Sequence, residues 1–367
     1  MSELRHDPLN KRWVIVAAER APRPSDFELI HEVHVGKERC PFCPGGEAQT
    51  PHEIFALRGG ENRSDSPGWS VRVVPNRYPA LAIEGQPDRR AVGPFDRMHG
   101  IGAHEVVIES PDHQLDLAEQ PLDQLVRIAG VWKSRIVDLM RDTRFKYVLL
   151  FKNHGSRAGA TLEHPHTQII ALPITPRAIA TELESSRQHH QLKERCLICD
   201  LLDFSIQDGS RVVFVHEHFM AICPYASRFP FEIFFAPRRH MHDFGQLPDD
   251  LLPAFTASFS EILRRLKAVL RNPAYNFVLH TSPNVHAEPK RTGHFFSLQW
   301  DWHWHIEILP RLTRTAGFEW GTEFHINPTA PEDAARALRE VELTGEGGDG
   351  TAPPDLPLGG FQGEGWR

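Results

Sequence analysis

Long hydrophobic runs are absent from this chain of 367 residues. No stretch approaches the roughly 18 consecutive apolar residues that mark a membrane-spanning helix. The N-terminal sequence MSELRHDPLNKRWVIVAAER also lacks the charged, then apolar, then small-residue order of a secretory signal. We therefore expect a cytoplasmic protein that has no membrane partner.

An excess of basic residues is also absent. Lys and Arg number 41 and Asp and Glu number 48, for a formal net charge of −7. Because nucleic-acid-binding surfaces are rich in Lys and Arg, this balance argues against a general nucleic-acid partner, and any phosphate must be bound by local donors. The 40% hydrophobic and 24% charged content is typical of a globular chain, long enough for two domains or a duplicated half.

Cysteine is scarce, and the five cysteines cannot all pair with one another. Four of them form two C-x-x-C pairs, CPFC (Cys40 and Cys43) and CLIC (Cys196 and Cys199). In a cytosolic chain such pairs are more often metal ligands or redox dithiols than structural disulfides. The 22 histidines favour mixed Cys/His metal sites, and the remaining Cys223 is expected in the core.

The sequence does contain an internal repeat. Each half shows, in the same order, a C-x-x-C pair, strands, a strand ending in a histidine (His113 or His240), a long amphipathic helix, a further strand and a final H-x-H strand. That final strand is HPHTQIIALP in the first half and HWHIEILP in the second. Because the order agrees throughout, we predict an internal duplication.

Apolar spacing predicts one long helix in each half. The segments 121–142 and 247–271 each place their apolar residues on one face. Segments such as EVVIESPDH and FEIFFAPRRH are rich in β-branched and aromatic residues, as in strands. We therefore expect an α+β fold, a duplicated unit of mainly antiparallel sheet with one long helix in each half.

The repeat also predicts the domain organisation. Residues 1–172, which contain the HPHTQ strand, are expected to carry a catalytic histidine and a zinc site. Residues 173–340 are expected to carry a second metal site and a substrate-binding surface. The polar segment PITPRAIATELESSRQHHQLKER is predicted to be a helical linker between the halves. Residues 341–367, rich in Gly and Pro near their end, are predicted to form a disordered tail.

The segment HPHTQ suggests catalysis. Side chains alternate along a strand, so His164, His166 and Gln168 share one side. A neutral imidazole is a competent nucleophile at phosphorus when its other nitrogen is held in one tautomer, and a Gln amide can donate to phosphoryl oxygens. We interpret His166 as a nucleophile or base and Gln168 as a donor. The alternative is a pair of surface or metal-binding histidines without catalysis.

Two cysteines and two histidines form a common structural zinc site. The repeat predicts two such sites, hence two zinc ions per chain, with the ligand sets Cys40, Cys43, His113 and His164, and Cys196, Cys199, His240 and His303. If His164 binds zinc, the metal anchors the strand that carries His166, and its role is architectural. One site shared by all four cysteines, or a redox dithiol, is the alternative.

The motifs HPHTQ, CPFC, SPDH and the second-half HWH together resemble those of galactose-1-phosphate uridylyltransferases, in the histidine-triad superfamily. The resemblance runs from about residue 4 to 339 and includes WVIVAAERAPRP and VVPNRYPAL. It implies a duplicated histidine-triad fold, a homodimer and a role in galactose metabolism. It also implies ping-pong transfer of UMP between UDP-hexose and hexose 1-phosphate through a covalent uridylyl-His166.

The resemblance implies further site residues. Gln168 would hold the phosphoryl oxygens, and its place is taken by a further His in the hydrolase branches. Other substrate contacts are expected from Arg20, Arg23, Asn76, Asn153, Thr161 and Glu323. The alternative for each arginine is a solvated surface charge.

Two departures from the galactose enzymes leave a second function open. Beyond Glu323 the sequence offers Asn327 where those enzymes use a Gln to hold the sugar. The second metal of some members is bound by a Glu and His residues, and Glu182 and His280 occupy those positions here, although CLIC favours the Cys/His set. Iron could replace zinc at this site. The alternative function is a phosphorylase that moves an adenylyl group from ADP-glucose or a dinucleoside polyphosphate to phosphate.

The second half is predicted to be catalytically silent. His305 is the counterpart of His166, but Glu307 stands in the place of Gln168, and a carboxylate repels a phosphoryl group. We expect His303 to be a metal ligand and His305 to be a packing histidine. A third, non-enzymatic interpretation is a zinc-stabilised nucleotide-binding protein.

Overall fold

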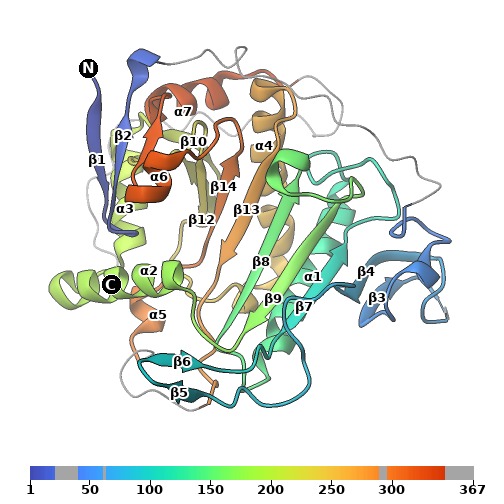
Figure 1. The fold of residues 1–367 in the computed structure, drawn as a ribbon. Helices are drawn as coiled ribbons and strands as arrows, with labels where there is room; N and C mark the ends of the chain where they lie inside the picture. Colours follow the sequence, from blue (N-terminus) through green and yellow to red (C-terminus); the bar gives the residue numbers. More distant parts are fainter. Residues whose placement is uncertain (21–39, 61–62, 289–295, 344–367) are drawn as a thin grey trace.

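The computed structural model of the protein describes residues 1–20, 40–60, 63–288 and 296–343. One sheet of 10 strands runs through its centre, and every pair of neighbours in it is antiparallel (Figure 1). Along the sheet the strands are, in order, β10 (Val212–Val215), β11 (Phe219–Ile222), β12 (Ile233–Pro237), β14 (His305–Pro310), β13 (Tyr275–His280), β8 (Tyr147–His154), β9 (His166–Leu172), β7 (Ala103–Ile108), β4 (Trp69–Pro75) and β3 (Phe55–Arg58).

The order of the strands shows the duplication directly. From the outer edge inward, the first half reads β3-β4-β7-β9-β8 and the second half reads β10-β11-β12-β14-β13. Each strand thus has a counterpart at the same place in the other half. The two halves meet where β8 pairs with β13, with His154 opposite Tyr275. The protein is a duplicated histidine-triad-like α+β unit, as the sequence predicts.

One long helix from each half covers the same face of the sheet. Helices α1 (Leu122–Met140) and α4 (Leu252–Leu270) pack against each other behind the sheet (Figure 1). Their buried side chains, Trp132 and Phe255 among them, join those of the strands in one core that both halves share. Since burying such a side chain contributes about 1.5–3 kcal/mol, this shared core holds the halves together.

Both helices match the predicted segments except at their ends. Helix α4 begins at Leu252, because residues 249–251 form a separate 3-10 turn and Pro253 lies in the first turn of the helix, where no N–H is needed. The histidines predicted to end strands lie beyond them. Strand β7 ends at Ile108, before Pro111, and β12 ends at Pro237, because proline cannot continue a ladder of hydrogen bonds.

The remaining elements surround this sheet. They are α2 (Arg177–Lys193), α3 (Leu197–Asp208), α5 (Leu298–Asp301), α6 (Gly317–Thr322), α7 (Pro331–Glu340), the hairpin β1 (Glu3–Asp7) and β2 (Arg12–Val16), the hairpin β5 (Arg90–Val92) and β6 (Phe95–Arg97), and β15 (His325–Asn327). Helix α2 corresponds to the predicted polar linker between the halves.

The N-terminal hairpin packs on the second half. Strand β2 pairs in parallel with β15, and the Arg5 guanidinium lies 2.7 Å from the carboxylate of Glu332 in α7. The hairpin belongs to the first half in sequence but packs on the second half. We nevertheless propose residues 1–172 and 173–340 as the two repeated units. The tail predicted over 341–367 lies outside the described residues from 344 onward.

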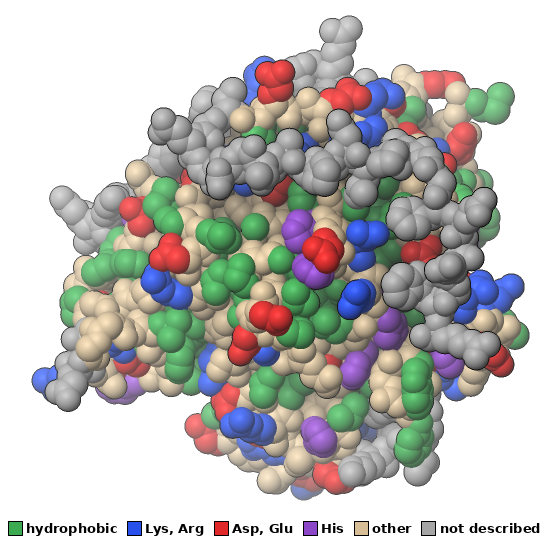
Figure 2. All heavy atoms as spheres, turned by 180° about the vertical axis from the view of Figure 1, so that it is seen from behind, with side chains coloured by type: hydrophobic (Ala, Val, Ile, Leu, Met, Phe, Trp, Pro, Cys, Tyr) green, Lys and Arg blue, Asp and Glu red, His purple; other side chains and the backbone are tan. Residues whose placement is uncertain are grey.

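Two findings bear on the predicted partners. Among the helices of the described residues, none combines the length and apolar character needed to cross a bilayer. On the part of the face seen from behind that grey atoms do not cover, acidic and basic side chains are scattered and no continuous basic surface is seen (Figure 2).

Candidate functional site

A cavity of about 310 Å³ opens on the face of the sheet opposite α1, in the first half. Its wall includes Phe42, Asn76, Tyr78, Thr161, His166 and Gln168. Small-molecule sites typically enclose about 300–1,000 Å³, so the space suits part of a nucleotide or a sugar phosphate.

His166 begins strand β9 at the base of this cavity. Its Nδ1 lies 2.8 Å from the carbonyl oxygen of His164 and donates to it, which leaves the lone pair on Nε2. Burial lowers the pKa of His166 to about 4, so the ring is neutral near pH 7. The ring of Phe42 packs edge-on against it with the centroids 5.3 Å apart. This is a neutral imidazole held in one tautomer.

Gln168 lies on the same face of β9 as His166, as strand alternation predicts. Its Oε1 lies 2.8 Å from Nε2 of His104 on β7 and 3.5 Å from Nδ2 of Asn76. Since Oε1 accepts from both neighbours, the amide nitrogen of Gln168 is the part left to serve a ligand. Sequence reasoning missed His104. The signal lies in the β7–β9 register, which places Val106 opposite Gln168 and so makes His104 a diagonal neighbour.

The first predicted set of metal ligands comes together beside this strand. Sγ of Cys43 lies 3.3 Å from Nδ1 of His113 and 3.5 Å from Nδ1 of His164, and Sγ of Cys40 lies 3.6 Å from the latter. The four ligand atoms lie within 4.8 Å of one another. Bonds of about 2.3 Å to sulfur and about 2.0 Å to nitrogen in a tetrahedron require separations of this size. Nε2 of His164 donates to the carbonyl of Ser110, 2.8 Å away, which leaves Nδ1 for the metal.

The second predicted set also forms a cluster. Sγ of Cys199 lies 3.5 Å from Nδ1 of His240 and 3.4 Å from Nδ1 of His303, and Cys196 completes the set. The outer nitrogens of both histidines donate to backbone carbonyls, those of Gln299 and Pro237. Both cysteine pairs therefore belong to separate clusters that could bind zinc, and the single site shared by four cysteines does not form.

A third group capable of holding a metal consists of Glu182, His280 and His305. Oε2 of Glu182 lies 2.9 Å from Nδ1 of His280 and 3.7 Å from Nε2 of His305. In the H-x-H segment of the second half, His303 thus belongs to the Cys/His cluster and His305 to the group with Glu182 and His280.

The other predicted contacts have different outcomes. Asn153 on β8 accepts a hydrogen bond from Asn276 on β13, 2.8 Å away, so its own amide nitrogen remains available. Thr161 lies in the cavity wall. Arg20 ends a short 3-10 helix over Ala18–Arg20 and its side chain is not among the described parts, and Arg23 lies outside the described residues.

Glu323 and Asn327, like Asn153, are not among the residues that line the cavity. Glu323, at the end of α6, is exposed and lies 3.4 Å from Arg177. Asn327 is buried and donates to the backbone carbonyls of Ser227 and Phe229. The amide nitrogen of Asn327 is therefore already bonded to the backbone and does not face the cavity.

The counterpart of the cavity in the second half is filled by protein. The ring of His305 stacks on Phe234 with the centroids 4.5 Å apart. The guanidinium of Arg228 lies 2.5 Å from the carboxylate of Glu307 and 2.8 Å from that of Glu232. An ion pair thus occupies the place that corresponds to Gln168, and the catalytic silence of this half stays a prediction.

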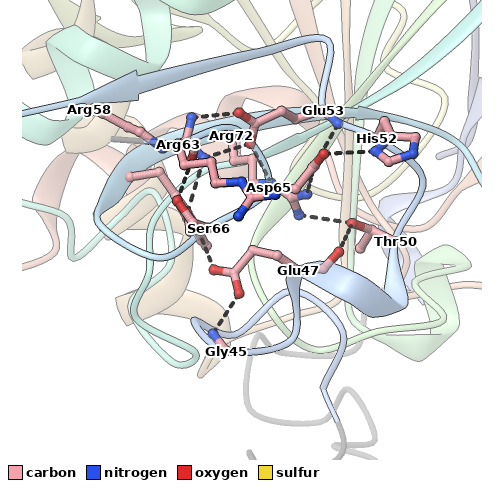
Figure 3. Close-up of polar contacts among 11 residues, drawn as sticks. Gly45, Glu47, Thr50, His52, Glu53, Arg58, Arg63, Asp65, Ser66 and Arg72 are labelled. Atoms are coloured by element: carbon pink, nitrogen blue, oxygen red, sulfur yellow. Dashed lines mark hydrogen bonds and ion pairs between the residues drawn. The ribbon is translucent and has the colours of Figure 1, made fainter. Parts of the chain in front are cut away.

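An ionic network fixes one wall of the cavity (Figure 3). Arg72 of β4, fully buried, donates to Glu53 at 3.0 Å, to Asp65 at 2.8 Å and to the hydroxyl of Thr50 at 2.9 Å. Its neighbour Arg58 makes two further bonds of 2.6 Å to Glu53. Because the network ties residues 50–53 to the sheet, it holds in place the loop after CPFC, which lines the cavity at Thr50 and Pro51.

Comparison with known proteins agrees with this arrangement. The profile of the galactose-1-phosphate uridyl transferase N-terminal domain matches residues 1–176. The ADP-glucose phosphorylase of Arabidopsis thaliana is 34% identical over 348 residues, which cover 93% of each chain. The galactose-1-phosphate uridylyltransferase of Thermotoga maritima is 31% identical over 351 residues, covering 94% of this chain and 99% of that protein.

Solved structures show the same relationship. The crystal structure of ADP-glucose phosphorylase from Arabidopsis thaliana with bound ADP-glucose superposes with a TM-score of 0.78 at 33% identity, covering 94% of this chain and 100% of that one. A uridylyltransferase structure superposes with a TM-score of 0.68 at 26% identity, covering 92% and 97%. The chain therefore belongs to the galactose-1-phosphate uridylyltransferase family of nucleotidyltransferases.

Proposed function

We propose that this protein transfers a nucleotidyl group from a nucleoside diphosphate hexose to a second phosphate through a covalent intermediate on His166. One observation carries the proposal. The neutral His166 ring lies at the base of the cavity, its Nδ1 is held by the His164 carbonyl, and the amide of Gln168 lies on the same face of the strand.

The chemistry follows from these groups. Nε2 of His166 attacks the α-phosphorus, the bond from that phosphorus to the bridging oxygen breaks, and hexose 1-phosphate leaves with the bonding electrons. The Nδ1 proton stays on the ring, where the His164 carbonyl stabilises the cation that forms. The Gln168 amide donates to the phosphoryl oxygens as negative charge builds on them. An oxygen of the acceptor phosphate then attacks the same phosphorus and releases neutral His166.

Zinc would support this chemistry without taking part in it. We propose two zinc ions per chain, one in each Cys/His cluster, with iron as a possible occupant of the second. A metal bound by His164 would hold the backbone two residues before His166. A homodimer, which the family resemblance implies, is also proposed.

ADP-glucose is our first candidate donor and inorganic phosphate our first candidate acceptor. The phosphorylase from Arabidopsis thaliana is 34% identical to this chain, against 31% for the uridylyltransferase of Thermotoga maritima. Its structure superposes with a TM-score of 0.78, against 0.68 for the uridylyltransferase structure at 26% identity. Asn327 also donates to a backbone carbonyl and so is not available to hold a sugar, which favours a specificity other than that for galactose. Uridylyl transfer from UDP-glucose to a hexose 1-phosphate is the second candidate, supported by the family profile and the Thermotoga maritima relative.

Covalent labelling tests the proposal. The protein is incubated with ADP-glucose or UDP-glucose radiolabelled in the α-phosphate, and acid-labile label on the protein is measured. We expect label from ADP-glucose and its release as ADP on addition of phosphate. His166→Ala should not be labelled, whereas His305→Ala, its matched control in the second half, should be. Label from UDP-glucose alone would favour the second candidate, and no label from either donor would leave a nucleotide-binding protein.

A further inference from the structure

A buried ion pair lies on the other face of the strand that carries His166. Nζ of Lys152 on β8 lies 2.9 Å and 2.8 Å from the two carboxylate oxygens of Glu109, just beyond β7. Both side chains are no more than 1% exposed. Neither belongs to the cavity wall, so neither can bind substrate directly.

Lys152 lies where strands β8 and β9 stop pairing, next to His166. The ladder between β8 and β9 ends at the pair Phe151 and Gln168, so the carbonyl oxygen of His166 loses its partner strand. A buried carbonyl needs a donor. Nζ of Lys152 supplies one, 3.1 Å from the His166 oxygen. The ammonium thus replaces a backbone donor at the residue proposed to do the chemistry.

Glu109 holds the neighbouring residues. Its carboxylate accepts from the hydroxyl of Thr167 at 3.1 Å, and its backbone N–H donates to the carbonyl of Pro165 at 3.2 Å. The next residue, Ser110, accepts from the proposed zinc ligand His164. Four consecutive residues, 164 to 167, are therefore held by Ser110, Glu109 and Lys152.

The pair offers what an apolar pair could not. Packed hydrocarbon of the same volume is often as stabilising as a buried ion pair, but it cannot donate to the His166 carbonyl or accept from Thr167. In-line attack on phosphorus depends on the position of Nε2, and a misplacement of about 1 Å can slow a reaction about 100-fold.

We propose that Lys152 and Glu109 are positioning residues that hold the backbone of His166 for attack on the α-phosphorus. This inference rests on the proposed function. It adds two residues that support the reaction from the face of the sheet opposite the cavity.

The test compares two buried ion pairs that share β7. Lys152→Met/Glu109→Leu removes the pair under His166. Arg135→Met/Glu105→Leu removes a second buried pair, with bonds of 2.8 Å and 2.7 Å and side chains 10% and 4% exposed, that forms no hydrogen bond with residues 164–167. For each protein we would measure the melting temperature, the zinc content and single-turnover labelling over a range of ADP-glucose and UDP-glucose concentrations. A third variant, Thr167→Val, keeps both charges and removes the hydroxyl that donates to Glu109 at 3.1 Å and accepts from Nε1 of Trp132 at 2.8 Å.

We expect Lys152→Met/Glu109→Leu to keep its zinc and its half-saturating donor concentration while the maximal labelling rate falls about 10- to 100-fold. Thr167→Val should lose about twofold to tenfold in that rate, and the Arg135 and Glu105 control should keep it. Should the first variant fail to fold, Thr167→Val decides the question. Wild-type rates in the folded variants, or an equal loss in the control, would overturn the positioning role. Wild-type protein that takes no label from either donor would instead overturn the proposed function.

Discussion

Nε2 of His104 and Oε1 of Gln168 lie 2.8 Å apart, joining adjacent strands at the edge of the cavity. A glutamine side chain can turn over and exchange its oxygen and nitrogen. A donor on His104 keeps the oxygen turned towards β7, so the nitrogen faces the site. His104, at a shorter distance than Asn76 (3.5 Å), is thus the main contact that sets which end of the amide a phosphoryl group would meet.

We predict that His104→Ala slows covalent labelling about tenfold, because only the longer 3.5 Å contact from Asn76 then holds the Gln168 oxygen, and the amide can turn that oxygen to an anionic phosphoryl group. A double-mutant cycle checks the cause. In a Gln168→Ala background, His104→Ala should have little further effect. Additive losses would show that His104 acts by another route. His99→Ala, which alters an exposed histidine, should leave the rate unchanged.

The two Cys/His clusters should differ in their importance for catalysis. We predict that Cys43→Ser and Cys199→Ser each lower the zinc content from two ions to one per chain. Only Cys43→Ser should also slow labelling, by about 10- to 100-fold, because its cluster includes His164, two residues before the nucleophile. Zinc analysis of the purified variants and labelling rates at saturating donor check this. Equal loss of activity in both variants would contradict a local architectural role.

The ion pair that fills the second half should matter for stability alone. Arg228→Ala leaves Glu307 and Glu232 without their buried partner, which typically costs about 3–5 kcal/mol of unfolding free energy. We expect that loss in urea unfolding, with labelling unchanged while the variant remains folded. Slower labelling by fully folded variant would show that the second half takes part in the reaction.

Asp65 should link the cavity wall to acid stability. Its hydrogen bond with His52, and further bonds from the Glu53 backbone and from Arg72, lower its pKa from 3.8 to about 2. A depressed carboxyl pKa contributes stability that is complete above the unfolded pKa and disappears as pH falls through the folded pKa. Asp65→Asn should therefore lower the melting temperature near pH 7, and the difference should shrink between pH 4 and pH 2. Asp88→Asn, at an exposed ion pair, is the control. A difference that stays constant with pH would contradict the shift.

The sequence predicted the parts of this protein that local pattern and repetition encode. Apolar spacing predicted α1 and α4, and alternation placed His166 and Gln168 on one face. The repeat grouped cysteines and histidines that lie up to 124 residues apart, and the fold brings Cys40 and His164 together as predicted.

The contacts that depend on strand register could not be predicted in this way. Nothing in the local sequence distinguishes Lys152 and Glu109 from exposed charged residues. Their role depends on the place where the pairing of β8 with β9 ends. His104 meets Gln168 only through the β7–β9 register. The pairing of the N-terminal hairpin with β15 joins segments from opposite ends of the chain, and neither carries a local signal of its partner.

The most direct test of the account is to locate the covalent nucleotide. Wild-type protein is incubated with ADP-glucose or UDP-glucose, quenched and digested under conditions that preserve a phosphorus–nitrogen bond, and the modified peptide is identified by mass spectrometry. The account predicts a nucleotidyl group on His166 within HPHTQ, and none in the same peptide from His166→Ala. A nucleotide on any other residue, or turnover by His166→Ala at the wild-type rate, would contradict it.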